Sequence, residues 1–521
     1  MAQFDRSDDQ VVVVIGSGAA GGTLANSLCQ AGIDVVLLES GPMVPAEEFI
    51  RDEWAGNELL GWNDRRLATG GWQMEESYPG QPVWHSEVVG GTSVQWLGVS
   101  LRMLPEELRA RSTYGAIDGA SLIDWPVDAN ELSSYYDRAE AIMAVSGTHG
   151  LPHNPMSENT RRIAVGSKAI GYMQFGPNPL AIVRDKHNGR GPSMQDGFSI
   201  QGDRARAKWS TAYTEIPAAL ATGRMDLRPN CRVVSIEADG DRVSAVLYRD
   251  ANGQMIRQET RFVVVAANSI ESPRILLASA NSEHPSGLAN GSDMVGRCYM
   301  RHVMGTLWSV FDEPVHMNRG ESMTGLVADE LYHNPERGFS GGYYIEQNAI
   351  SLPAMARVLD PHLWGRDLTY ALDHYASMGG MIAVGEDLPQ LSNRVTLDTG
   401  KLDAFGVPLA SIHYDDHPND SAMRNHAYDA MEAIHRAAGA TRCYRSPPFP
   451  ATHNLGTVRM SSRPEDGVVD SFGIAHEVKN LMVSGGPIFP TSGAANPTLT
   501  IVALALRQAD HLADRLKRSG R

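Results

Sequence analysis

The sequence predicts an α/β protein in which a largely antiparallel domain is inserted into a domain built on a parallel sheet. Three observations favour this class. A strand, a glycine turn, a helix and a second strand follow one another early in the chain, an alternating strand-rich stretch follows residue 230, and a last strand precedes a long helix. Parallel strands need crossover connections, usually helices, whereas antiparallel strands are joined by short turns. A chain of 521 residues is also long enough for two or three domains.

The first predicted unit spans residues 11–41 and has the order of a parallel strand–helix–strand motif. Its apolar run at residues 11–15 is short enough for a strand that is buried on both faces. An alanine-rich stretch over residues 19–30 predicts a helix, which Gly32 ends. A second apolar run at residues 35–38 predicts the parallel partner strand.

Three glycines with G-x-G-x-x-G spacing join the first strand to the helix and predict a dinucleotide site. Gly16 permits a tight turn, Gly18 lets the backbone approach a pyrophosphate, and Gly21 lets helix and strand pack closely. The helix N-terminus adds free N–H groups and partial positive charge. Glu39 follows the second strand, where its carboxylate can accept ribose hydroxyls and repels a 2′-phosphate. A glycine-rich turn that binds nothing is the weaker alternative.

The bulk properties exclude several classes of protein. A net charge of −16 argues against nucleic acid or an anionic membrane as a partner. No apolar run approaches the length of about 18 residues that a membrane span needs, and the short polar N-terminus predicts no signal peptide. The cysteines lack CxxC spacing and predict reduced thiols rather than a disulfide set or metal site. We therefore expect a cytoplasmic protein. The four cysteines are Cys29, Cys231, Cys298 and Cys443.

The middle of the chain adds a second glycine turn at residues 88–98 and a helix within residues 125–146, with Asp128 as its N-cap. Residues 150–205 are rich in Pro, Asn, Gly and Arg and predict loops over a site. Residues 231–265 alternate in polarity between turn sequences, which predicts a three-stranded antiparallel meander.

The third strand of that meander, FVVVAA, ends at Ala266 and leads into a helix with Pro273 near its start. Residues 311–444 are mixed, with strand-like patches. A final strand is predicted at residues 481–485 and a helix at residues 498–518.

The first unit, the meander and the last strand–helix pair predict one nucleotide-binding domain around an inserted substrate domain. Because parallel sheets bind ligands at the carboxyl ends of their strands, we expect Gly16, Ala266 and Gly485 to meet at that edge. The predicted boundaries are residues 1–105, 200–310 and 445–521 for the nucleotide-binding domain, and residues 106–199 and 311–444 for the substrate domain.

A histidine and an asparagine near the C-terminus are candidate catalytic residues. His453 lies in the sequence THNLGTVRM, and Asn496 precedes Pro497, which favours a helix start. An imidazole can take a hydroxyl proton because its pKa lies near working pH, and an amide can hydrogen-bond the same oxygen as charge develops. Beside a dinucleotide site this pair suits alcohol oxidation. Because the chain has 17 histidines, spacing alone leaves a surface or capping role open for His453.

Together these motifs resemble the glucose–methanol–choline (GMC) oxidoreductases over most of the chain. The resemblance rests on the N-terminal fingerprint, the VVGGTS turn, WPVDANELSSYYDRAEAIMAVSG, AANSIESPRILLAS and the HNLGT and NPTLT sequences. It implies a Rossmann-like FAD-binding domain with an inserted, largely antiparallel substrate-binding domain, and an FAD enzyme that oxidises an alcohol. The ending SGGPIFPTSGAANPTLTIVALAL looks most like pyranose oxidases and bacterial glycoside and C-glycoside 3-oxidases. That branch uses a histidine–asparagine pair, and the resemblance assigns its positions to His453 and Asn496.

Two residues depart from the pattern of that branch. Gln95 stands where fungal pyranose oxidases carry a histidine that links covalently to the flavin, so the resemblance implies dissociable FAD. Leu97 replaces their threonine, which points to a difference at the oxygen-reacting face of the flavin. Membrane-associated gluconate-type dehydrogenases of the superfamily usually carry an export signal and clustered cysteines, and this sequence shows neither.

The resemblance also implies which residues contact FAD. The first glycine turn would hold the pyrophosphate, Glu39 the adenosine ribose and the backbone of Val233 the adenine. The second glycine turn would follow the ribityl chain and the ring, and the N-terminus of the last helix would border the pyrimidine end. The expected contacts are Gly16, Gly18, Ala19, Ala20, Gly21, Glu39, Ser40, Gly90, Gly91, Thr92, Ser93, Gln95, Trp96, Val233, Ala266, Ala267, Gly485, Gly486, Asn496, Pro497 and Thr498.

We therefore expect His453 to take the proton of a secondary hydroxyl, at C-2 or C-3 of a pyranose sugar or glycoside, while a hydride passes to flavin N5. Oxygen, with release of hydrogen peroxide, or a quinone-type acceptor would reoxidise the flavin, and no metal is expected. One alternative is a GMC alcohol dehydrogenase or oxidase that acts on a non-sugar alcohol. A nicotinamide enzyme and a flavoprotein-like binding module without catalysis are weaker alternatives.

Overall fold

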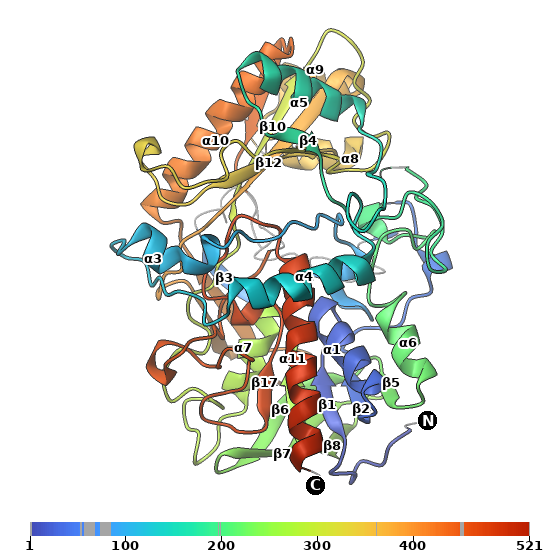
Figure 1. The fold of residues 1–521 in the computed structure, drawn as a ribbon, viewed down its shortest axis with the longest axis vertical. Coiled ribbons are helices and arrows are strands. Elements are labelled where there is room, and N and C mark those ends of the chain that lie inside the picture. Colours follow the sequence, from blue (N-terminus) through green and yellow to red (C-terminus); the bar gives the residue numbers. More distant parts are fainter. Residues whose placement is uncertain are drawn as a thin grey trace.

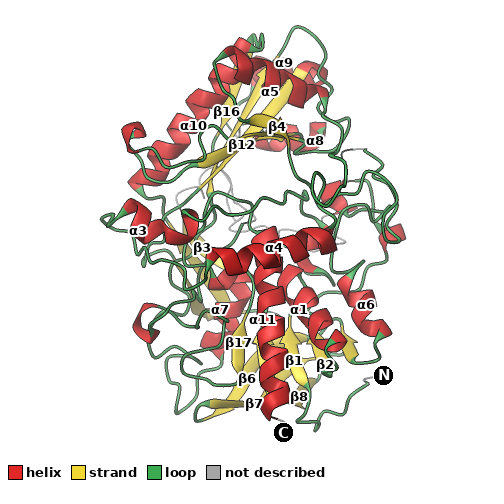
Figure 2. Cartoon of the chain, in the orientation of Figure 1, coloured by secondary structure: helices red, strands yellow, loops and turns green. Residues whose placement is uncertain are grey.

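The computed structural model of the chain has the predicted α/β class, with a parallel sheet and an antiparallel sheet at opposite ends of the long axis (Figures 1 and 2). The described residues also form two smaller sheets. The structure describes residues 3–52, 55–56, 68–72, 85–195, 197, 199–360, 362–448 and 453–519.

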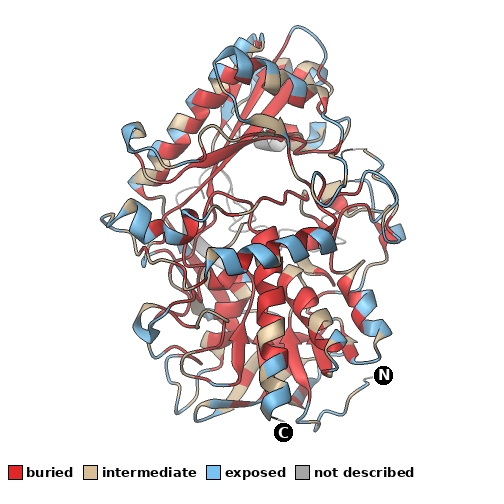
Figure 3. Cartoon of the chain, in the orientation of Figure 1, coloured by how far each residue is buried: buried red, intermediate tan, exposed pale blue. Residues whose placement is uncertain are grey.

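The parallel sheet is formed by segments that lie far apart in the sequence. Its strand order is β17–β9–β1–β2–β5, and every neighbouring pair is parallel. All residues of β1, β2 and β9 are buried, because helices cover the sheet (Figure 3). The strands are β1 (Val12–Ile15), β2 (Val35–Leu38), β5 (Met225–Arg228), β9 (Phe262–Val265) and β17 (Leu481–Val483).

The meander prediction was wrong for its third strand. The antiparallel sheet contains β6 (Arg232–Asp239), β7 (Arg242–Arg249) and β8 (Met255–Glu259), whereas β9 lies in the parallel sheet between β1 and β17. The apolar run of β9 does not alternate with polar residues, and such a run is typical of a strand covered on both faces.

The helices of the first and last units lie where the sequence predicts them. Helix α1 (Ala19–Gln30) packs beside α11 (Thr498–Ser519), and α11 shows a buried stripe and an exposed C-terminal end in Figure 3. Helix α4 (Ala129–Met143) crosses α11 and is capped as predicted, because the Asp128 carboxylate accepts hydrogen bonds from Asn130 N at 2.9 Å and Glu131 N at 3.0 Å.

The six-stranded antiparallel sheet has the order β16–β10–β13–β12–β11–β4. One face packs against α10 (Pro418–Ala437) and α5 (Glu158–Ala169), and the other face turns toward the parallel sheet. Strand β10 comes from the range predicted for the nucleotide-binding domain. The strands are β4 (Phe175–Pro177), β10 (Val303–Val310), β11 (Gly325–Val327), β12 (Tyr343–Asn348), β13 (Met378–Gly385) and β16 (Arg442–Ser446).

Helix α5 corrects the prediction of loops over residues 150–205. Ser157 caps it by accepting a hydrogen bond from Thr160 N at 3.1 Å, and the buried Ile163 faces the core. Its remaining residues are mostly polar, so the sequence offers only a weak helical pattern. The other elements are β3 (Ala68–Trp72), β14 (Arg394–Leu402), β15 (Pro408–Tyr414), α3 (Ala110–Tyr114), α6 (Glu215–Ala221), α7 (Asn268–Ala278), α8 (Leu352–Val358) and α9 (Gly365–Asp373).

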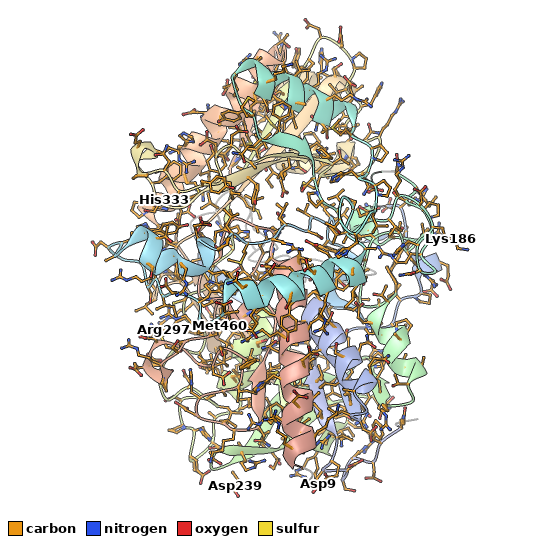
Figure 4. All side chains as sticks on the ribbon, viewed as in Figure 1. Asp9, Lys186, Asp239, Arg297, His333 and Met460 are labelled. Atoms are coloured by element: carbon orange, nitrogen blue, oxygen red, sulfur yellow. The ribbon has the colours of Figure 1, made fainter. Side chains whose placement is uncertain are left out.

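The carboxyl ends of the parallel strands point toward the six-stranded sheet. Asp9, just before β1, and Asp239, at the end of β6, lie at the lower end of the view, whereas His333 lies in the upper half (Figure 4). The strand β1 therefore runs from the lower end toward the middle of the molecule. In the described part of the chain, no helix has the length and apolar character that crossing a membrane requires.

Candidate active site

A cavity of about 490 Å³ lies at the carboxyl edge of the parallel sheet and is closed on its far side by the six-stranded sheet. Of the residues predicted from the sequence, Gly21 and Gly90 do not line it. The predicted residues that do are Gly16, Gly18, Ala19, Ala20, Glu39, Ser40, Gly91, Thr92, Ser93, Gln95, Trp96, Val233, Ala266, Ala267, His453, Gly485, Gly486, Asn496, Pro497 and Thr498.

The three glycines of the first turn have different physical roles. Gly16 has a φ of +96°, and a Cβ there would lie 2.5 Å from the carbonyl oxygen of Ala266. A Cβ on Gly21 would lie 1.9 Å from the carbonyl oxygen of Gly16, so Gly21 allows α1 to pack on the turn. A Cβ on Gly18 would meet only Gly91, at 3.9 Å. Gly18 is therefore the position where the backbone is open to a ligand.

The second glycine turn packs directly against the first. Gly90, with a φ of +95°, donates a hydrogen bond from its N–H to Ser17 Oγ at 2.9 Å. A Cβ on Gly91 would lie 3.0 Å from Gly18 Cα. Gly90 therefore joins the two turns without lining the cavity, while Gly91 and the residues after it form the cavity wall.

Glu39 is fixed at the end of β2 by its own surroundings. Its carboxylate accepts hydrogen bonds from Ser17 N at 3.0 Å, Ser17 Oγ at 2.6 Å and Gly41 N at 2.9 Å. Burial raises the pKa of Glu39, while the Ser17 hydroxyl and the nearby N–H groups oppose that shift. Val233 of β6 also lines the cavity, and the pairing of β6 with β7 shifts register after this residue.

The N-terminus of α11 opens onto the cavity. Asn496, Pro497 and Thr498 line it, and the first turn of this 22-residue helix carries no acidic side chain. The helix therefore directs the positive end of its dipole at the cavity. The side chain of Asn496 is buried, and its Oδ1 has no hydrogen-bond partner among the described residues.

These features fit a bound FAD. The open backbone at Gly18 and the N-terminus of α1 suit a pyrophosphate, Glu39 suits a ribose, and the unpaired Asn496 and the α11 N-terminus suit a polar ring. No group of His, Cys, Asp or Glu that could hold a metal ion is present among the residues described.

We expect Gly18→Ala and Gly21→Ala to separate FAD binding from folding. The Gly18 methyl fits the protein but occupies the cradle, so thermal stability stays within about 0.5 kcal/mol of the parent while FAD affinity falls at least about tenfold. The Gly21 methyl meets a backbone oxygen and costs about 1–3 kcal/mol or more. FAD content per chain and the melting temperature of flavin-free protein measure the two effects. Equal behaviour of the two variants would contradict the assignment.

The loop that carries His453 is attached to α7. The hydroxyl of Ser269 donates to the Asn454 carbonyl at 2.7 Å, and the hydroxyl of Thr457 donates to the Ser269 carbonyl at 2.9 Å. In an uninterrupted helix that carbonyl would bond the N–H of residue 273, but Pro273 has none. Pro273 therefore frees the carbonyl that holds the loop.

His453 forms a hydrogen-bonded pair with His302. The two Nδ1 atoms are 2.9 Å apart, and His302 Nε2 lies 3.2 Å from the carbonyl oxygen of Ser492. A carbonyl only accepts, so the hydrogen-bond network assigns the proton of neutral His302 to Nε2. His302 Nδ1 then accepts the Nδ1 proton of His453. This leaves Nε2 of His453 unprotonated, on a ring that lines the cavity.

His302 is held in place by backbone contacts. Its φ of +66° lies in the left-handed region, and the carboxylate of Asp387 accepts hydrogen bonds from Arg301 N at 2.7 Å and His302 N at 3.1 Å. Burial lowers the pKa of His302, although Asp387 opposes the shift. The His302 ring is therefore neutral, and its Nδ1 can accept a hydrogen bond from the Nδ1–H of His453.

The pKa of His453 lies well below its ordinary value near 6.5, mainly because of burial and also because of the neighbouring His302. A base works in its unprotonated form, which is present above this pKa and lost as the pH falls through it. We expect kcat/KM to show no inflection from this group near pH 6.5 and to fall only at a pH well below it. A pH–rate profile measures this, and an acid limb centred near the ordinary histidine pKa would contradict it.

The residues after the second turn are fixed by polar contacts. The Ser86 hydroxyl donates to Gln95 Oε1, and Trp96 Nε1 donates to the Trp209 carbonyl at 2.8 Å.

Sequence reasoning missed His302, Asp387 and Glu346 of the cavity region. None of the three carried a usable local pattern, because even Glu346 stands in the strand sequence YYIEQN, where two further polar residues follow it.

Comparison with known proteins identifies the family. The profiles of the GMC oxidoreductases match residues 13–304 and 389–505. The chain is 32% identical to 2-methyl-1,2-propanediol dehydrogenase of Mycolicibacterium austroafricanum, over 98% of this chain and 96% of that protein. It is 31% identical to paromamine 6′-oxidase of Streptomyces fradiae, over 98% and 92%, and 28% identical to the fructose dehydrogenase large subunit of Gluconobacter japonicus, over 97% and 98%.

Solved structures agree with the fold. Pyridoxine 4-oxidase from Mesorbium loti superposes with a TM-score of 0.67 at 17% identity, over 96% of this chain and 99% of that one. Formate oxidase of Aspergillus oryzae superposes with a TM-score of 0.66 at 14% identity, over 98% and 100%. With its sequence matched over most of its length, the chain belongs to the GMC oxidoreductases, FAD-dependent enzymes that act on CH–OH groups.

Proposed function

We propose that this enzyme oxidises a secondary hydroxyl of a pyranose sugar or glycoside, at C-2 or C-3, to a keto sugar. The observation that carries the proposal is the His453–His302 pair, which leaves an unprotonated nitrogen on a ring in the wall that also contains Asn496. This histidine and asparagine are the pair implied by the resemblance to the pyranose oxidase branch.

FAD is the cofactor, and we propose that it is held without a covalent bond, because the amide of Gln95 cannot form one. Gly18, Glu39 and the N-terminus of α11 would hold its pyrophosphate, ribose and ring. When bound, FAD accepts a hydride at N5 and passes the electrons to oxygen, giving hydrogen peroxide, or to a quinone-type acceptor.

The other roles in the reaction are assigned to side chains of the cavity. His453 takes the substrate hydroxyl proton at Nε2, while its Nδ1 proton stays on the hydrogen bond to His302. The Asn496 amide hydrogen-bonds the same oxygen as it gains negative charge. The apolar side chains of Met304, Trp308 and Ile382 limit the water that reaches it.

The relatives support both a sugar and a smaller alcohol. Paromamine 6′-oxidase and the fructose dehydrogenase large subunit support an alcohol on a sugar. The 32% identity to 2-methyl-1,2-propanediol dehydrogenase supports a second candidate, a small non-sugar diol. The cytoplasm remains the proposed location, with neither nucleic acid nor a membrane as a partner.

A substrate screen tests the proposal. Purified protein is mixed without oxygen with glucose, O- and C-glycosides, 1,2-diols and simple alcohols, and bleaching of the flavin absorbance is followed. We expect sugars or glycosides to bleach it fastest and oxygen to restore the colour with release of peroxide. Bleaching by small diols alone would select the second candidate. Acid precipitation is expected to release free FAD, and yellow protein pellets would contradict non-covalent binding.

A further inference from the structure

One face of the six-stranded sheet forms the cavity wall opposite the parallel sheet. Side chains alternate along a strand, so β12 turns Glu346 and Asn348 to the cavity and Tyr343 and Ile345 to the layer beneath α10. The neighbouring strands add apolar side chains to the cavity face, including Ile382. Glu346 is therefore an acidic residue on a mainly apolar wall.

Glu346 is buried without ordinary partners. Its side chain is 0% exposed, and the strand register places Leu326 and Ile382 on either side of it. Neither carboxyl oxygen has a hydrogen-bond partner of normal geometry within the described residues. The amides of Asn178 and Asn496 lie beside it and favour its charged form, but burial outweighs them and raises the pKa of Glu346 to about 8.

The two amides are also incompletely satisfied. Both polar atoms of the Asn178 side chain and Oδ1 of Asn496 are buried without a hydrogen-bond partner among the described residues. Buried polar groups are normally paired, and a group left unpaired at a functional site points to a partner that arrives later. Glu346 and Asn496 line the cavity, and Asn178 lies beside Glu346 outside the lining, so unused hydrogen-bonding capacity gathers where the cavity reaches β12.

We propose that Glu346, with the Asn178 amide beside it, forms a substrate subsite that binds a hydroxyl group on the carbon next to the one oxidised. This inference rests on the proposed function, in which Asn496 bonds the reacting oxygen. Because Glu346 lies beside Asn496, a substrate hydroxyl that contacts Glu346 would be carried by the carbon next to the one that bears the reacting oxygen. A vicinal diol unit presents two hydroxyls in this arrangement.

The surroundings favour a neutral hydroxyl over an ammonium group. A protonated carboxyl both donates and accepts, as a hydroxyl does. His302 and His453 are held neutral, and Tyr344, the next residue of β12 on the same face, also has a raised pKa. Among the titratable groups described here, the cavity thus disfavours charge at its substrate end. A cationic ligand would first require Glu346 to ionise.

The test compares trans-1,2-cyclohexanediol, cyclohexanol and 2-aminocyclohexanol as probes. The readout for each probe is the rate of anaerobic flavin bleaching divided by the dissociation constant of that probe. We expect the parent enzyme to prefer the diol to cyclohexanol by about tenfold or more. Glu346→Gln keeps a donor and an acceptor and should keep most of this preference. Glu346→Leu should bring the ratio close to one, through a loss that is larger with the diol than with cyclohexanol.

Gln347→Leu is the matched control, because Gln347 is a buried neighbour on the same strand that faces away from the cavity and bonds Thr324 N at 2.8 Å. It should lose stability but keep the diol preference. An equal loss with diol and cyclohexanol in Glu346→Leu would overturn the subsite and assign Glu346 to positioning Asn496. A loss confined to the amino alcohol in Glu346→Gln would overturn it in favour of a cation site. Bleaching by no alcohol at all would instead refute the proposed function, and the subsite with it.

Discussion

Replacement of His453 by alanine is expected to lower kcat by about 10²–10⁴-fold, the usual contribution of a positioned general base. The enzyme should stay yellow, because the FAD-binding elements at Gly18, Glu39 and the α11 N-terminus do not depend on this side chain. The physical reason is that a neutral hydroxyl gives up a hydride poorly unless its proton is accepted at the same time. Stopped-flow bleaching of the flavin at saturating substrate measures the effect on the chemical step directly.

Added imidazole provides the control for this prediction. A small base can enter the space left by the His453 ring, so part of the rate should return in proportion to its unprotonated concentration. Undiminished bleaching in a flavin-loaded His453→Ala enzyme would show that another group takes the proton. Loss of bound FAD in the same variant would show that the side chain is needed for the cofactor instead.

His302→Asn is expected to lower kcat/KM by about 10- to 100-fold, the size of effect seen when the partner that orients a metal-binding histidine is removed. Asparagine tolerates the left-handed φ of +66° but is too short to replace the ring. Without the acceptor at 2.9 Å, His453 loses the contact that fixes its tautomer and the neighbour that helps to lower its pKa. The acid limb of the pH–rate profile should therefore move to higher pH, toward the ordinary histidine value.

The shift of the profile separates a positioning role from simple damage to the fold. His435 is a matched control, because it is also a fully buried histidine, bonded to Ser309 Oγ at 2.8 Å, and lies outside the cavity. His435→Asn should lower the melting temperature and leave the pH profile unchanged. A profile that stays in place in His302→Asn would contradict the proton arrangement derived for the pair.

The parts of the fold that local sequence determines were predicted well. The unit from β1 to β2 and the cap at Asp128 depend on neighbouring residues, so spacing alone located them. Strand β9 was misplaced because its alternatives, a meander edge and a parallel sheet, differ only in partners that come from distant segments. The order of the six-stranded sheet depends on pairings such as β10 with β13, whose sequence separation hides the register.

The candidate site shows the same division. The glycine turns carry a motif, and His453 and Asn496 were candidates from their chemistry and position that the family resemblance then supported. His302 carries no local pattern, because its proposed role depends on a distance to His453 that only the pairing of the segment before β10 with the His453 loop creates. Glu346 is followed by two polar residues in YYIEQN, so the sequence did not single it out, and which face of that strand meets the cavity was decided by the sheet register.

The two imidazoles are carried by segments that pair directly with each other. Met300 N donates to the Leu455 carbonyl at 3.0 Å and Leu455 N donates to the Met300 carbonyl at 2.9 Å, two residues from each histidine. Beyond this bridge the first segment enters β10 of the six-stranded sheet, whereas the second is tied to α7, which follows the parallel strand β9. The spacing of the two rings is therefore set by a local backbone bridge rather than by the packing of the two layers as wholes.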